Sequence, residues 1–138
     1  MIFDLPIHPL VVHAVVILVP LAALLLVLAV CVPRLRGVCG PLGVILAVLG
    51  AISAVVADQS GSILTDYVGT PEEHIRWGLP TVYSSSAMAL TALLWFFIRH
   101  RVARSVFGVL TILSAIAAVT FTVLAGHSGA EAVWGELS

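Results

Sequence analysis

Four long apolar runs, separated by short polar segments, organise this sequence. They cover about residues 10–32, 38–57, 79–98 and 102–125. Each is long enough to cross the hydrocarbon core of a bilayer, which takes about 20 residues of α-helix. Backbone N–H and C=O groups find no water in lipid, so a helix, which satisfies them internally, is the expected conformation. The pattern therefore predicts four transmembrane helices.

The third helix is expected to begin before its apolar run. In the segment TPEEH, Thr70 suits the capping position, Pro71 the first helical position and Glu73 the reciprocal bond of a capping box. We therefore predict one domain over residues 1–138, with helices at about 10–32, 38–58, 71–98 and 102–126. Between the second and third helices, the stretch SILTDY fits a short helix or a strand.

Composition supports a membrane protein. The chain is 61% hydrophobic and 9% charged, with a mean hydropathy of +1.18, whereas about 25% of the residues in a soluble domain are charged. Lipid is therefore the expected surrounding, and nothing in the sequence indicates nucleic-acid binding. The two cysteines, Cys31 and Cys39, are too few for a disulfide framework. They are interpreted as small apolar residues, with a redox or metal pair as the minor alternative.

Charge divides the two ends of the helices. Five of the six basic residues, all arginines, lie in the two short loops, and Arg76 is the exception. The acidic residues fall at the other end: Asp4, Asp58, Asp66, Glu72, Glu73, Glu131 and Glu136. Since positive loops stay in the cytoplasm, we expect both termini outside it. Short connections then predict an all-α, up-down-up-down four-helix bundle.

Small residues repeat at every fourth position on two of the helices. Such faces usually mark helix contacts in lipid. The sets are Gly50, Ala54 and Asp58 on the second helix, and Ser114, Ala118 and Thr122 on the fourth.

Four of the five histidines are predicted to lie at the outer end. They are His8, His13, His74 and His127, whereas His100 lies among the cytoplasmic arginines. With Asp58 on the second helix, each helix delivers a candidate ligand to one layer. His13 lies one turn inside the apolar run, where polar groups usually face the bundle interior and a partner. His74 lies at a helix N-terminus, which favours the neutral imidazole that binds metal. Histidine is also tolerated at membrane interfaces without any ligand.

Two kinds of ligand fit this layer. Imidazoles on facing helices are usual axial ligands of b-type haem, and small residues would line its groove: Gly50, Ala54, Ser84, Ser85, Ser86, Gly126 and Gly129. Alternatively, His13, His74, His127 and Asp58 form a ligand set for Zn, Cu or Fe. No CxxCH, HExxH, GxSxG or P-loop pattern occurs. No charge lies mid-membrane, which argues against a channel or a proton-coupled transporter.

The sequence resembles a bacterial membrane family, the domain of unknown function numbered 2231. That family typically opens with HPxxVH, which HPLVVH matches from His8 to His13, and ends its last helix with GHxGG and an aromatic residue. GHSGAEAVW matches from Gly126, with Ala130 in place of the second glycine. The resemblance implies four spanning helices in the bacterial cytoplasmic (inner) membrane. Some relatives carry Rieske-type iron–sulfur domains, which suggests electron transfer, although this chain lacks the cysteines for one.

Three functions follow as hypotheses. The first is a small cytochrome-like electron-transfer protein with b-type haem bound by His8, His13, His74 and His127, exchanging electrons with quinone or a redox partner protein. The second is a histidine-rich metal-binding membrane protein. The third is a non-catalytic accessory subunit of a larger membrane complex. The sequence assigns no catalytic residue and leaves a homo-oligomer open.

Overall fold

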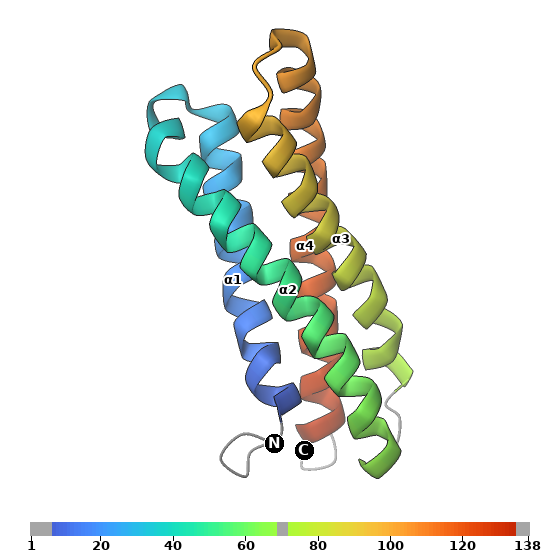
Figure 1. Cartoon of the computed structure of the whole chain (residues 1–138). Helices are drawn as coiled ribbons and strands as arrows, with labels where there is room; N and C mark the ends of the chain where they lie inside the picture. Colours follow the sequence, from blue (N-terminus) through green and yellow to red (C-terminus); the bar gives the residue numbers. More distant parts are fainter. Residues whose placement is uncertain (1–6, 69–71, 135–138) are drawn as a thin grey trace.

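The computed structural model describes the backbone of residues 7–68 and 72–134 and the side chains of residues 10–59 and 77–127. Four helices account for nearly all of it (Figure 1). They are α1 (Ile7–Cys31), α2 (Arg36–Val68), α3 (Glu72–Phe97) and α4 (Arg101–Trp134), with the 3₁₀ turn η1 (Pro33–Leu35) between the first two. The described residues contain no strand, so the predicted all-α class is confirmed.

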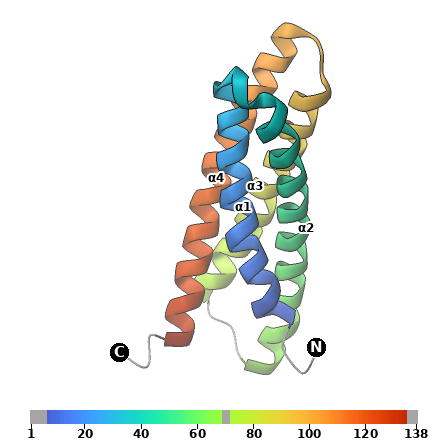
Figure 2. The ribbon, with the colours of Figure 1, turned by 90° about the vertical axis from the view of Figure 1, so that its left-hand side faces the viewer.

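The helices run alternately up and down. α1 packs mainly against α2 and α3 mainly against α4, while the α2–α3 and α1–α4 contacts close the ring. α1 and α3 are diagonal neighbours that scarcely touch. The two side views show that α1 begins and α4 ends at the same end of the bundle (Figures 1 and 2). We call this the histidine end, because it holds His8, His13, His74 and His127, and the other the arginine end.

All four helices are long and apolar enough to cross a membrane. The candidate spans are Leu10–Cys31, Pro33–Gln59, Trp77–Phe97 and Arg101–His127. Large apolar side chains such as Leu24, Ile45, Leu90 and Ile116 cover the outside of the bundle. An apolar exterior on this scale belongs in lipid rather than in water.

Two helices extend further than the sequence predicts. α2 continues to Val68 instead of ending near Asp58, so the SILTDY stretch is helical. α4 continues to Trp134 instead of ending near Gly126. The apolar run marks where lipid contact ends. The helix itself continues because polar residues are also compatible with helix once its end reaches water.

Small residues bring the helices together, as the repeats predict. Eight of the thirteen buried residues of the main core cluster are alanines. Gly50 is buried, and a Cβ added there would lie 3.1 Å from Cγ2 of Val19. Gly43 approaches α1 still more closely, because a Cβ there would lie 2.9 Å from Cδ2 and 3.2 Å from the backbone N of Leu26. On α4, Ala118 and Thr122 are buried.

Candidate functional site

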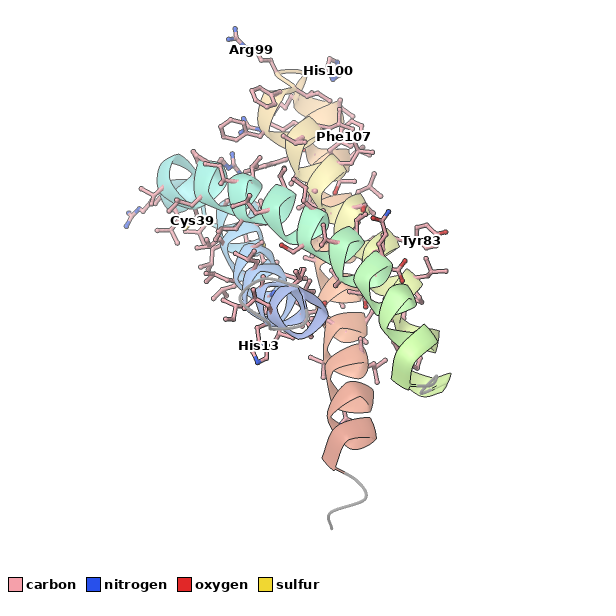
Figure 3. All side chains as sticks on the ribbon, turned by 60° about the horizontal axis from the view of Figure 1, so that its bottom comes forward. His13, Cys39, Tyr83, Arg99, His100 and Phe107 are labelled. Atoms are coloured by element: carbon pink, nitrogen blue, oxygen red, sulfur yellow. The ribbon has the colours of Figure 1, made fainter. Side chains whose placement is uncertain are left out.

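The fold carries the four predicted histidines to one end on three different helices. His8 lies in the first turn of α1 and His74 in the first turn of α3, although their side chains lie outside the described residues. His13 follows on α1, and His127 lies in the last third of α4. His100 lies at the opposite end, between α3 and α4 (Figure 3). The histidine end is therefore the candidate site.

His13 faces outward, which corrects one expectation. The sequence predicts that His13 faces the bundle interior, but this side chain is exposed and points away from the neighbouring helices (Figure 3). α1 is apolar around its whole circumference, since it meets lipid on one side and the core on the other. Its sequence therefore gives no signal for which face is buried.

His127 lies close to the same surface. It is exposed, and it follows Gly126, where an added Cβ would lie 4.0 Å from Cγ2 of Val16. Val16 is three residues after His13, so the two positions share a side of α1. Positions 13 and 127 therefore lie near one seam, the line along which α1 and α4 meet at the histidine end.

Asp58 lies on the other side of the bundle. It is half-buried on α2, and its Oδ1 is 3.3 Å from where a Cβ on Gly78 of α3 would be. The carboxylate is thus at the α2–α3 contact and not at the α1–α4 seam. Among the described side chains, no three His, Cys, Asp or Glu residues gather closely enough to hold a metal ion.

Aromatic and small residues fill the bundle just inside this end. Trp77 of α3 stacks at a tilt on Phe121 of α4, with ring centroids 5.8 Å apart. The small residues predicted to line a haem groove do not all face the bundle interior. Gly50 and Ala54 are buried in helix contacts, and Ser86 is exposed.

Three buried hydroxyl groups, two on α3 and one on α4, show where polar side-chain atoms lie inside the bundle. Ser84 donates hydrogen bonds to the carbonyls of Pro80 and Thr81. The buried Oγ of Ser85 and Oγ1 of Thr122 have no hydrogen-bond partner. A buried hydroxyl without a partner carries an energetic cost, so these are two positions of the described bundle that a bound polar group would stabilise.

At the arginine end the structure forms a pocket that the sequence does not reveal. It has a volume of about 440 Å³ and is lined by Arg36, Arg99, Arg101 and Arg104 around the buried ring of Trp95. The sequence predicts a cytoplasmic basic loop here. Trp95 carries no signal of its own, because it lies in the run ALLWFFI, which has the composition of any lipid-facing helix end.

Comparison with known proteins identifies a family but no characterised relative. A family model described as "Predicted membrane protein (DUF2231)" matches residues 4–136. No curated protein and no solved structure matches the chain.

Proposed function

Because the chain belongs to the DUF2231 family of predicted membrane proteins, whose description states no activity, we propose a function from the placement of its histidines. The protein is a small electron-transfer component that binds b-type haem at the histidine end. The observation that carries this proposal is that three helices deliver His8, His13, His74 and His127 to that one end.

The diagonal pair of helices suits a haem best. A haem iron takes axial ligands from its two opposite faces, and the macrocycle between them requires helices farther apart than close-packed neighbours. α1 and α3 are such a pair. His8 lies in the first turn of α1 and His74 in the first turn of α3, so these two residues come from the diagonal pair at the histidine end. We therefore propose that His8 and His74 would hold the haem iron.

A metal ion is the second candidate, favoured by the α1–α4 seam. A Cβ added at Gly126 would lie 4.0 Å from Cγ2 of Val16, so α1 and α4 approach each other here. An ion such as Zn²⁺ or Cu²⁺ bound by imidazole nitrogens at about 2 Å fits between close-packed neighbours without widening the bundle. His13 and His127 lie near this seam and would supply two of its ligands.

Absorption spectra and metal analysis of the detergent-purified protein test both proposals. The variants are His8→Ala, His13→Ala, His74→Ala and His127→Ala, with His100→Ala at the opposite end as the matched control. A Soret band that is lost in His8→Ala and His74→Ala but kept in His100→Ala supports haem. Metal without a Soret band, lost in His13→Ala and His127→Ala, supports the ion.

Either proposal has a clear refutation. Protein without a Soret band after haem supplementation and without bound metal overturns both. An accessory role in a larger membrane complex is then the interpretation to pursue.

We infer the orientation from the charge distribution. The arginine end faces the cytoplasm of a bacterial cell and the histidine end faces outward, since positively charged connections are retained inside. The bound centre would then exchange electrons with quinone in the inner membrane or with a redox protein outside it.

A further inference from the structure

We propose that the pocket at the arginine end binds the phosphate group of an anionic lipid. This site is independent of the histidine end and of the function proposed for it. Four arginines, Arg36, Arg99, Arg101 and Arg104, line the pocket, and none of its lining residues is acidic. Like charges gathered around one cavity repel each other, and a bound anion removes that repulsion.

Two of the arginines are held in place by Trp95. The guanidinium carbon of Arg36 lies 5.7 Å from the centroid of the Trp95 ring and that of Arg104 lies 5.2 Å from it. Both distances are within the range of a cation–π contact. Because Trp95 is only 2% exposed, the indole is a fixed platform that positions both cations at the pocket wall.

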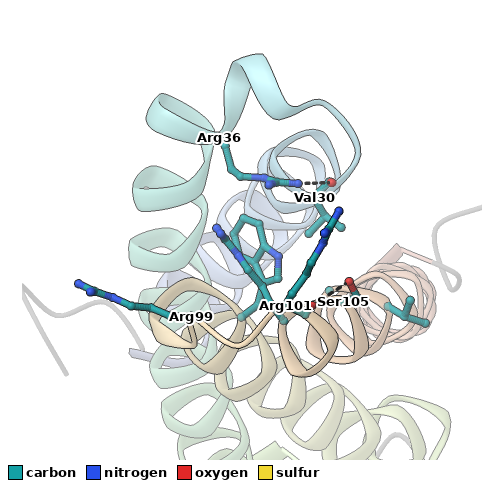
Figure 4. Close-up of a pocket in the computed structure, with 9 residues that line it drawn as sticks. Val30, Arg36, Arg99, Arg101 and Ser105 are labelled. Atoms are coloured by element: carbon teal, nitrogen blue, oxygen red, sulfur yellow. Dashed lines mark hydrogen bonds between the residues drawn. The ribbon is translucent and has the colours of Figure 1, made fainter.

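The two cations differ in their hydrogen bonding. Arg36 donates from Nε to the carbonyl of Ala29 at 3.0 Å and from a terminal nitrogen to the carbonyl of Val30 at 3.1 Å, which caps the end of α1 (Figure 4). Nε of Arg104 is buried and has no hydrogen-bond partner. A buried charged donor without an acceptor is costly, so an anion that accepts from Arg104 would stabilise this arrangement.

The position of the pocket selects a lipid as the source of the phosphate. Its lining also includes the apolar side chains of Val30 and Val109. The pocket lies where the apolar spans of α1, α3 and α4 end, at the depth of lipid headgroups. Basic pockets between helices at the cytoplasmic side suit anionic headgroups, and Arg presents paired N–H donors that match phosphate oxygens.

The test uses the full chain in neutral detergent. In a Trp77→Phe, Trp134→Phe background, Trp95 fluorescence is followed while phosphatidylglycerol, phosphatidylcholine or inorganic phosphate is titrated into the micelles. A saturable change with phosphatidylglycerol and none with the other two supports the lipid. A saturable change with inorganic phosphate assigns the same site to a soluble phosphate compound instead and overturns the lipid assignment.

Charge-removing variants separate the pocket from surface charge in general. Arg101→Gln and Arg104→Gln are expected to weaken binding at least about tenfold, the usual effect of losing a charge-assisted hydrogen bond. Arg34→Gln removes the same charge from the same end, but Arg34 lies outside the pocket, so binding should persist. Circular dichroism checks folding, and the exposed Arg101 provides a variant with little structural effect. Equal weakening in all three variants, or no saturable binding by any probe, overturns the proposal.

Discussion

The closest approach of two helices should also be the position least tolerant of an added methyl group. At Gly43 of α2, a Cβ would lie 2.9 Å from Cδ2, 3.0 Å from Cγ and 3.2 Å from the backbone N of Leu26. An ordinary contact begins near 3.4 Å. Since Leu26 is fully buried and one of the atoms belongs to backbone, rotation of a side chain cannot relieve the overlap, and α1 and α2 must separate.

The expected cost of Gly43→Ala follows from that separation. Inserting a methyl group into a well-packed core usually lowers stability by about 1–3 kcal/mol. Because the atoms around Gly43 are held rigidly, we expect a decrease of about 2 kcal/mol at this position. In water, replacing a helical glycine by alanine would return up to about 1 kcal/mol of helix propensity. In a membrane the separated helices remain helical, so little of that gain is expected. The folding equilibrium should shift roughly 30-fold toward separated helices.

Gly50→Ala and Gly37→Ala provide a graded comparison on the same helix. At Gly50 the nearest atom is a side-chain methyl group of Val19 at 3.1 Å, so a smaller cost of about 1 kcal/mol is expected. At Gly37 no atom lies within 4 Å, so stability should not change. The free energy of unfolding would be measured by titrating SDS into detergent micelles. Equal stability of Gly43→Ala and Gly37→Ala would refute the predicted overlap with Leu26.

Three further measurements test other parts of the structure. Trp95→Leu should lower the free energy of unfolding by about 2–3 kcal/mol, because the indole is 2% exposed and contacts two arginines. Trp95→Phe should lower the free energy of unfolding by a smaller amount. Equal decreases in the two variants would contradict a role for the large ring. His100 accepts a hydrogen bond at Nδ1 from the backbone N–H of Ala103 at the start of α4. His100→Ala should therefore lower the free energy of unfolding by about 0.5–1 kcal/mol, and His100→Asn should keep most of the stability. Unchanged stability in both variants would show that His100 does not cap α4. Cys31 is exposed and Cys39 buried, so a maleimide that does not cross membranes should label Cys31 in inverted vesicles but not in intact cells; labelling in intact cells would reverse the inferred orientation.

Hydropathy predicts the helices of this protein but not which faces they bury. The four apolar runs identify α1 to α4 because any segment in lipid must satisfy its own backbone. The same property hides the direction of His13, since lipid and the bundle core are both apolar and α1 carries no polar face. The ends of α2 and α4 are missed for a related reason, because a helix that leaves lipid loses its apolar composition without losing its hydrogen bonds.

The sequence likewise predicts one of the two candidate sites but not the other. That four histidines share one end follows from counting helices and loops, so the sequence predicts it. That Arg36 and Arg104 meet at Trp95 depends on how α2, α3 and α4 pack at the arginine end. The three residues of that contact are far apart in the chain, so no local sequence pattern predicts it.

The extra length of α2 and α4 gives the protein two unequal faces. The apolar runs of the sequence end near residues 57 and 125, whereas α2 continues to Val68 and α4 to Trp134, so at 1.5 Å per residue each helix extends roughly 14–17 Å further. At the opposite face the connections are only a few residues long. A soluble protein that approaches the histidine end therefore meets two helices that continue past their apolar runs, whereas one that approaches the arginine end meets only short connections.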